Sequence, residues 1–411
     1  MSLELIENQV NTKINHKDII LDKSSTCSIC NKSNLIEIMN MPSLPISGQF
    51  STRKPVGILE GIDQSLLWCP ECAHGQLSSR ISPCILYDSQ KYALRTSLSE
   101  TSKEGTKVFL DYLKKLTFNK NFNCIFDVGC NDLYLLKEMK ACSKIRVGLD
   151  PIWISNKPDN DDPDLFVIGG SIEDADLNKA LPERPDLIIC RHTLEHIFSV
   201  KMVLKKLIDF STEDAIFLFE IPLFESLLTR GRFDQIFHEH LQYFSLSSFN
   251  ILLEKCKVEL IDYTENYQNW GTLMIAFKKG ASKQKRFEFP FTIKEIEQRK
   301  NLFFSQMDNT IKILLDLTNT PIYGYGAALL LPVLAYHLKT DFSFLKAVID
   351  DAEEKDGLFY ANLPLEIQHS SKITKFNELA IFITAIDNVK PIMTKLFPYR
   401  PKHIIYPFHI M

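Results

Sequence analysis

The segment FHEH, residues 237–240, places two histidines and a glutamate among aromatic and apolar residues. Histidine changes its charge near neutral pH and is the side chain most often used to move protons. His238, Glu239 and His240 are therefore candidates for proton transfer. The surrounding stretch, residues 233–245, has few turn-forming residues, which argues against a plain surface loop. The alternative is that both histidines point the same way from a strand and are hydrogen-bonded in the core.

Two C-x-x-C pairs lie in the N-terminal quarter, CSIC with Cys27 and Cys30, and CPEC with Cys69 and Cys72. Each pair can bring two thiolates together, and two pairs complete a tetrahedral shell for Zn²⁺. Four thiolates leave no open coordination position, so the predicted metal is structural. A redox dithiol would need only one such pair in a thioredoxin-like context, and unligated core cysteines are the other alternative.

The stretch IFDVGCNDLYLL combines an apolar strand, Asp127, Gly129 and the start of a helix. Such a turn lets backbone N–H groups approach a negatively charged ligand, and Asp150 ends the next strand, where a carboxylate can accept hydrogen bonds from a ribose. A single glycine in a turn can also be simple turn geometry. Because the dinucleotide pattern G-x-G-x-x-G is absent and Leu133 stands where a glycine would be expected, the segment favours S-adenosylmethionine over a nicotinamide.

A later segment, DLIICRHTLEHI, places Arg191 and His192 at the carboxyl end of another strand, on the rim where ligands bind in such sheets. His196 is expected in the following helix, either as a hydrogen-bonded histidine beneath the site or with a direct role. The residues expected to bind the cofactor are Asp127, Gly129, Asn131, Asp150, Ser171, Ile172, Arg191 and His192.

Near the C-terminus, PIYGYG again places glycines, Gly324 and Gly326, between a strand and a helix, and the next strand ends in Asp350 and Asp351. The turn could hold a diphosphate, or it could be a closely packed strand–helix turn, which glycines serve equally well. Alone it would indicate a nicotinamide site, so an NAD-dependent dehydrogenase is the second enzyme class considered. The segment shows no further feature of hydride transfer.

Strand-like and helical segments alternate from about residue 101 to residue 279, which predicts a mostly parallel sheet covered on both faces. Residues 278–287 are expected to form a linker, residues 293–317 a long amphipathic helix, and the following residues a second strand–helix–strand unit. The expected helices of the first unit are residues 133–140 and 200–210, and its expected strands are residues 124–128, 145–149, 165–168, 187–190, 215–220, 258–263 and 273–277.

The composition is that of an ordinary globular protein, with 411 residues, 45% hydrophobic and 24% charged. A formal net charge of −4 argues against a generic nucleic-acid binder. The sequence shows neither a signal peptide nor a run of apolar residues long enough to span a membrane. We therefore expect a cytoplasmic protein with reduced cysteines, without nucleic-acid or membrane partners, and monomeric or weakly dimeric.

The chain resembles the bacterial nucleotide-sugar C-methyltransferases, which add a branch methyl group to C-3 of a 4-keto-deoxysugar. The marks of this resemblance are CSIC, CPECAHGQL, IFDVGCND, CRHTLEHI, FEIP, FHEHLQYFS, GYGA and VIDD, in the same order over essentially the whole length. It implies an α/β protein of three parts that enclose a nucleotide-sugar between them. These are a zinc-binding module (residues 1–95), a class I S-adenosylmethionine-dependent methyltransferase domain with a Rossmann-like fold (96–285) and a C-terminal Rossmann-like domain that binds the nucleotide-sugar (286–411).

By this resemblance His240 is the general base, Glu239 contacts the sugar or orients the base, and His238 belongs to the same catalytic segment. The substrate carbon becomes a nucleophile only after a proton next to the keto group is removed, and a neutral imidazole can remove it. The residues implied in substrate binding are Tyr92, Phe237, Asn269, Trp270, Gly324, Tyr325, Gly326 and Asp350.

The chain departs from the family pattern near this site. Phe237 replaces a tyrosine, NWGT (residues 269–272) replaces His-Gly-Gly-Ser, and Leu94 replaces the second residue of a tyrosine pair. One interpretation is an active methyltransferase with an unusual acceptor, which could be oxygen or nitrogen. The other is a sugar-nucleotide-binding protein that has lost catalysis. A third possible function is a zinc-dependent adaptor that binds nucleic acid or another protein. Only the cysteine pairs support it.

Overall fold

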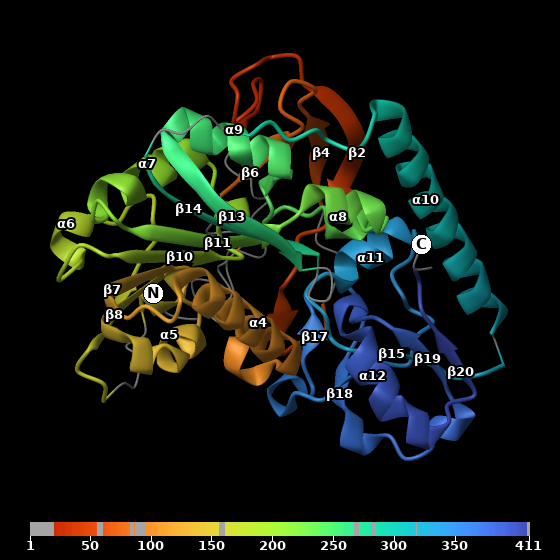
Figure 1. The fold of residues 1–411 in the computed structure, drawn as a ribbon. Coiled ribbons are helices and arrows are strands. Elements are labelled where there is room, and N and C mark those ends of the chain that lie inside the picture. Colours follow the sequence, from red (N-terminus) through yellow and green to blue (C-terminus); the bar gives the residue numbers. More distant parts are fainter. Residues whose placement is uncertain are drawn as a thin grey trace.

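The computed structural model describes residues 20–55, 61–82, 86, 95–155, 161–266, 271–280, 285–317 and 319–408. Three regions, each built around its own sheet, pack side by side (Figure 1). None of the helices among these residues is long and apolar enough to cross a membrane.

The N-terminal region is a four-stranded antiparallel sheet that borrows one strand from the middle of the chain. Its strand order is β12-β5-β4-β2, and β12 follows directly after the FHEH segment. A further strand, β1 (Ile20–Lys23), pairs with β6 (Ser79–Ile81). The four strands are β2 (Ile36–Leu44), β4 (Ile62–Trp68), β5 (Gly75–Leu77) and β12 (Gln242–Tyr243).

The central region is a seven-stranded sheet of order β13-β14-β11-β10-β7-β8-β9. Strands β7 to β11 are parallel, whereas β14 is antiparallel to both of its neighbours, so the expectation of a mostly parallel sheet is confirmed. All seven expected strands are present: β7 (Phe122–Val128), β8 (Ser143–Asp150), β9 (Leu165–Gly169), β10 (Leu187–Arg191), β11 (Ile216–Pro222), β13 (Val258–Asn266) and β14 (Thr272–Lys279).

Alternating side chains of these strands pack on opposite faces of the sheet, as the two-residue repeat of a strand requires. Phe126, Ile188 and Phe217 face a core that includes α7 and α9, while their neighbours in sequence face a core that includes α4 and α5. The helices of this region are α4 (Glu100–Thr117), α5 (Tyr134–Glu138), α6 (Leu177–Ala180), α7 (Val200–Phe210), α8 (Phe224–Thr229) and α9 (Leu246–Cys256).

The C-terminal region is a parallel sheet of order β18-β16-β15-β19-β20, the doubly wound arrangement, so the second strand–helix–strand unit is confirmed. The two-residue strand β17 leaves this region and pairs with β3 (Phe50–Ser51) near the N-terminus. The elements are α10 (Ile293–Asp316), β15 (Ile322–Tyr325), α11 (Leu331–His337), β16 (Val348–Asp350), β17 (Phe359–Tyr360), β18 (Ile367–His369), β19 (Ala380–Ile383), α12 (Val389–Leu396) and β20 (His403–Ile405).

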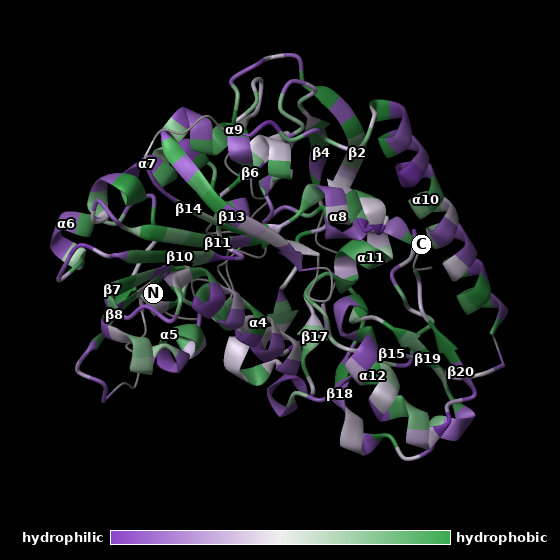
Figure 2. Cartoon of the chain, in the orientation of Figure 1, coloured by the Kyte–Doolittle hydropathy of each residue, from purple (hydrophilic) through white to green (hydrophobic). Residues whose placement is uncertain are grey.

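Helix α10 runs along the outside of the molecule from the N-terminal sheet to the C-terminal sheet (Figure 1). It mixes polar and apolar residues, whereas the strands of the central sheet are mostly hydrophobic (Figure 2). Its buried residues Ile296, Phe303 and Met307 share one hydrophobic core with Ile38 of β2 and Phe382 of β19. The core therefore joins the N- and C-terminal regions through this helix.

The expected linker at residues 278–287 needs correction, because Lys278 and Lys279 still belong to strand β14. The domain boundaries at 95/96 and 285/286 stay a prediction. Two strand pairings cross them, β12 with β5 and β17 with β3, so the three regions are interlocked by backbone hydrogen bonds.

Candidate active site and cofactor turn

The turn after β7 has the backbone shape expected of a ligand-binding turn. Gly129 has a φ of +80°, and an added Cβ would overlap the hydroxyl of Thr193, so no larger residue fits. Asp127 is buried, and its Oδ1 has no hydrogen-bond partner among the described residues. Burial raises the pKa of Asp127 to about 7, although the charge of Arg191 opposes this shift. An unpartnered carboxylate in a buried turn fits a ligand that donates a hydrogen bond.

Asp150 ends β8 next to this turn. Its carboxylate already accepts hydrogen bonds from two backbone N–H groups. Its Oδ2 accepts from the Asn131 amide at 2.9 Å and its Oδ1 from the Ile152 amide at 3.0 Å. A carboxylate has about four acceptor positions, so both oxygens keep capacity for ribose hydroxyls. Burial also raises the pKa of Asp150.

Leu133 takes the left-handed conformation, with φ of +68°, at the start of α5. This explains why a glycine is the expected residue there. The Leu133 side chain is buried in the same core as Phe109 and Leu136. A side chain packed in the core does not fill the turn that would hold a cofactor.

Arg191 and His192 lie at the end of β10, but Arg191 is engaged inside the protein. Its Nε donates to Glu220 at 2.7 Å and its Nη1 to Thr106 at 3.0 Å. Glu220, at the end of the neighbouring strand β11, also accepts from Thr272 at 2.8 Å. Burial alone would raise the pKa of Glu220, but the charges of Arg191 and His192 lower it overall. Arg191 therefore fixes an ion pair at the rim of the sheet.

His196 lies in the short 3₁₀ turn Leu194–His196 and not in helix α7, which corrects the expectation. Its ring forms a hydrogen bond to the backbone of Glu239, and burial lowers its pKa to about 4. The ring centroids of His196 and His240 lie 4.8 Å apart in an edge-on contact. His196 thus contacts the FHEH segment in two ways, through the backbone of Glu239 and through the ring of His240.

The FHEH segment is a partly buried loop between two short elements, and the strand placement considered as an alternative is wrong. Fully buried His238 contacts the Leu44 carbonyl through Nε2 at 2.9 Å. The carbonyl can only accept, so Nε2 is the protonated nitrogen. Burial lowers the pKa of His238 to about 4. His238 ties the loop to β2, and its predicted catalytic part stays a prediction.

Glu239 points toward the N-terminal region and accepts from the hydroxyl of Ser47 at 2.8 and 2.9 Å. Burial raises its pKa to about 7, with the Ser47 hydrogen bond acting in the opposite direction. A carboxyl group with a pKa near neutrality can change its protonation during a reaction.

His240 is partly buried, and its ring packs on Phe237 at 4.2 Å between centroids. Burial, followed by the charges of His196 and His192, lowers its pKa well below the ordinary value. The imidazole is therefore neutral at physiological pH and has a lone pair that can accept a proton.

Of the other residues expected to bind the cofactor or the substrate, some belong to the part of the chain that the structure describes and others do not. Ile172 is buried, and the Ser171 hydroxyl donates to Asp174 at 2.8 Å. Tyr92, Asn269 and Trp270 lie outside the described residues.

The glycine turn of the C-terminal region is explained by packing. Added Cβ atoms would overlap Ala385 at Gly326 and approach Thr384 to 3.0 Å at Gly324. The Asp350 carboxylate accepts from the Ala327 amide at 2.6 Å, within the same turn. Asp350 thus closes the turn, and its contact with a substrate stays a prediction.

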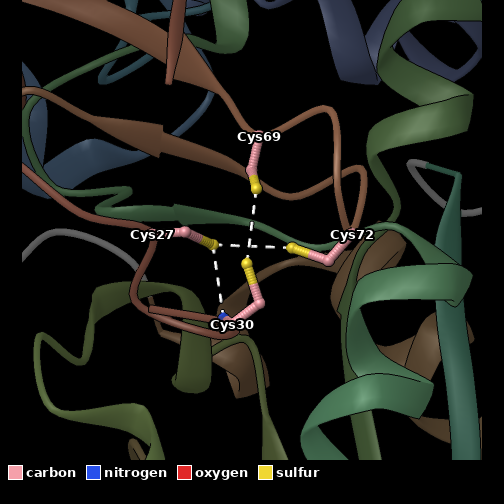
Figure 3. A group of neighbouring side chains, drawn as sticks. All are labelled: Cys27, Cys30, Cys69 and Cys72. Carbon is pink, nitrogen blue, oxygen red and sulfur yellow. Dashed lines mark hydrogen bonds between the residues drawn. The ribbon is translucent and has the colours of Figure 1, made fainter. Parts of the chain in front are cut away.

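The two cysteine pairs meet, with all four sulfur atoms within 4.8 Å of one another (Figure 3). The Sγ atoms of Cys27 and Cys72 lie 3.5 Å apart and those of Cys30 and Cys69 3.4 Å apart. Zn–S bonds of about 2.3 Å in a tetrahedron place sulfur atoms about 3.8 Å apart, so the group fits a structural Zn²⁺.

Several residues that build this site were assigned no role from the sequence pattern. Glu220 lies in the FEIP segment at a strand end, a position that could have marked it. Ser47 and the Leu44 carbonyl are about 190 residues away from their partners Glu239 and His238, and no local pattern announces these contacts.

Comparison with known proteins agrees with this geometry. Residues 102–261 match the family model described as a methyltransferase domain. The match covers most of the central region and less than half of the chain. The chain is also 22% identical over 253 residues to the C-methyltransferase NovU of Streptomyces niveus. That alignment spans 61% of this chain and 59% of the relative, so the chain spans less than two thirds of the relative that it matches.

Solved structures similar to part of this chain include a putative S-adenosylmethionine-dependent methyltransferase from Listeria monocytogenes, with 16% identity, 42% of this chain and 97% of the other covered, and a TM-score of 0.34. Another is the N-methyltransferase NodS from Bradyrhizobium japonicum WM9, with 12% identity, 44% and 97% covered, and a TM-score of 0.33. At TM-scores this low the two likenesses support no functional argument.

Proposed function

We propose that this protein is an S-adenosylmethionine-dependent methyltransferase that methylates a carbon atom of a nucleotide-linked keto-deoxysugar. The observation that carries the proposal is the neutral imidazole of His240, whose ring contacts that of His196 just beyond the carboxyl end of β10. This is the edge at which open α/β sheets bind their ligands. The similarity to a protein named as a C-methyltransferase supports a carbon acceptor.

A carbon next to a keto group must lose a proton before it can attack a methyl group. His240 accepts this proton on its free ring nitrogen, because burial and the neighbouring histidines keep the ring neutral. Glu239, fixed by Ser47, orients the loop or contacts a sugar hydroxyl. Phe237 packs on the His240 ring and adds no hydroxyl donor, so it restricts the ring without helping to bind the enolate oxygen.

When bound, S-adenosylmethionine supplies the electrophilic methyl group. The turn at Gly129 and Asn131 and the carboxylates of Asp127 and Asp150 would hold it, because this turn has an unpartnered buried acceptor and a glycine that no larger residue can replace. Holding the acceptor carbon in line with the methyl group contributes much of the rate in such reactions.

Two further assignments complete the proposal. The four cysteines hold a structural Zn²⁺ that organises the N-terminal region, which in turn positions Ser47 and Leu44 against the FHEH loop. The C-terminal Rossmann-like region contacts the nucleotide of the substrate. Oxygen or nitrogen remain alternative acceptor atoms, and the exchange experiment below distinguishes them from carbon.

The test is the His240→Gln variant, assayed with S-adenosylmethionine and a nucleotide-linked 4-keto-6-deoxyhexose. We expect methyl transfer to fall by about 10²- to 10⁴-fold, the usual contribution of a general base, with unchanged cofactor affinity. The exposed His403→Gln variant is the matched control and should keep full activity. Exchange of the substrate's α-proton with deuterated water should be seen in the wild type and lost in His240→Gln.

Loss of cofactor affinity in His240→Gln would show that the histidine has a structural role. Methyl transfer by the wild type without α-proton exchange, giving an O- or N-methylated product, would replace the carbon acceptor by the alternative.

A further inference from the structure

A cavity lies between helix α7 and the chain segment around Ser24–Ser28, next to the first cysteine pair. It measures about 840 Å³, within the usual range of roughly 300–1,000 Å³ for small-molecule sites. Its walls come from the segment around Ser24–Ser28, from β5, β6 and β12, and from α7 along its whole length. Neither the cofactor turn at Gly129 nor His240 lines it, so it is separate from the proposed methyl-transfer site.

The lining of this cavity is positively charged. Arg80, Lys201, Lys205 and Lys206 face a single carboxylate, Asp209, in a chain whose net charge is −4. The positive charge of the cavity therefore does not follow from the overall composition. This charge favours the binding of an anionic ligand.

None of these four cations has a carboxylate partner among the described residues. Lys206 is fixed by the carbonyls of Ile172 and Glu173 at 2.9 and 3.2 Å. For Arg80, Lys201 and Lys205 we find no ion pair within the described parts of the chain, and Arg80 stacks over the Phe198 ring at 4.9 Å. Lys201 and Lys205 are four residues apart on α7, so they lie on the same face of the helix.

The opposite wall is polar and held in place by hydrogen bonds. The Ser28 amide donates to Gln76 at 2.8 Å, and the Ser28 hydroxyl donates to Gln242 at 2.8 Å. Gln242 in turn donates to the Ile197 carbonyl at 3.0 Å. Both glutamines are buried. The wall is thus organised before any ligand arrives, which lowers the entropy cost of binding.

Helix α7 adds its positive end to this arrangement. It is 11 residues long, its N-cap residue Ser199 makes no side-chain capping bond, and both Ser199 and Val200 line the cavity. Free N–H groups at a helix start attract anions, and here they add to the lysines.

We propose that this cavity binds a small phosphate ester with at least two negative charges, of the size of a nucleoside diphosphate. A volume of about 840 Å³ is large enough for such a molecule, and the acidic chain argues against a nucleic-acid strand as the occupant. The inference does not depend on the proposed methyl transfer, because binding here requires neither His240 nor the cofactor turn.

The test is calorimetric titration of the full-length, zinc-loaded protein with inorganic pyrophosphate and, separately, with ADP. We expect binding that weakens as salt is added, since the contacts are between charges. The Lys201→Ala/Lys205→Ala double variant should bind about tenfold more weakly or worse, because it loses two charge-assisted contacts. Lys312→Ala, an exposed lysine of α10, is the matched control and should bind like the wild type.

Circular dichroism and zinc content, unchanged in the double variant, exclude a folding defect. Binding of both probes would mean that the diphosphate is sufficient, and binding of ADP alone that the nucleoside is also recognised. The proposal is overturned if neither probe binds, or if the double variant binds as tightly as the wild type.

Discussion

His240 and its neighbours obtain their chemical properties from burial rather than from residue type alone. Burial lowers the pKa of His240 and raises that of Glu239 to about 7. The sequence predicts that these residue types lie together, because they are adjacent. It could not predict that His238 contacts Leu44 or that Glu239 contacts Ser47, since these partners are distant in sequence and lie in another region.

Leu133 combines a strained left-handed backbone with a buried side chain, and the two effects can be separated by mutation. Replacing it with glycine should relieve about 1 kcal/mol of left-handed strain but remove a buried side chain worth about 3 kcal/mol, so Leu133→Gly should lose about 2 kcal/mol of unfolding free energy. Cofactor affinity should not change, because the side chain lies in the core. Urea denaturation measures the first quantity and calorimetry the second.

Lys257→Gly is the matched control, because Lys257 is also left-handed, with φ of +57°, but exposed. It should be neutral or slightly stabilising. Tighter cofactor binding by Leu133→Gly would show instead that the leucine obstructs the turn.

Regular elements were predicted well wherever a strong local pattern specified them. The helix at residues 200–210 and the central strands follow from their apolar repeats. The FHEH loop, the 3₁₀ turn that contains His196 and the two-residue strand β12 were not predicted. Such short elements are set by distant pairing partners, and no local repeat reveals them.

The paired cysteines couple zinc binding to the stability of the N-terminal region. Cys69→Ser should release about one zinc ion per chain and destabilise the N-terminal region, because binding a structural metal contributes folding free energy. Zinc content and thermal unfolding measure the two effects. Cys142→Ser, outside the cluster, should leave both unchanged. A variant at Cys69 that keeps the wild-type stability without zinc would contradict the structural assignment.

The whole molecule is held together by contacts that cross the three regions. Arg232 donates to Asp234 at 2.8 Å and to Asp387 of the C-terminal region at 2.7 Å. Arg232 is buried and lies just before the FHEH loop. The two Rossmann-like units could be predicted from their strand–helix alternation, whereas this interlocking could not, because each contact joins residues far apart in sequence.

Arg232→Leu should cost about 3–5 kcal/mol of unfolding free energy, because it leaves two acidic side chains without their cation. Chemical denaturation measures this loss. Lys339→Leu breaks the exposed ion pair with Asp308 and should cost less than about 1 kcal/mol. Equal, small losses in both variants would show that the Arg232 contacts do not stabilise the packing of the regions.

The most direct test of the central claim is calorimetric titration of the purified protein with S-adenosylmethionine and S-adenosylhomocysteine, with NAD as the control. The proposed use of S-adenosylmethionine predicts that both sulfur ligands bind with dissociation constants of roughly micromolar order and that NAD does not bind. Absence of binding by both sulfur ligands, or binding of NAD in their place, would contradict it.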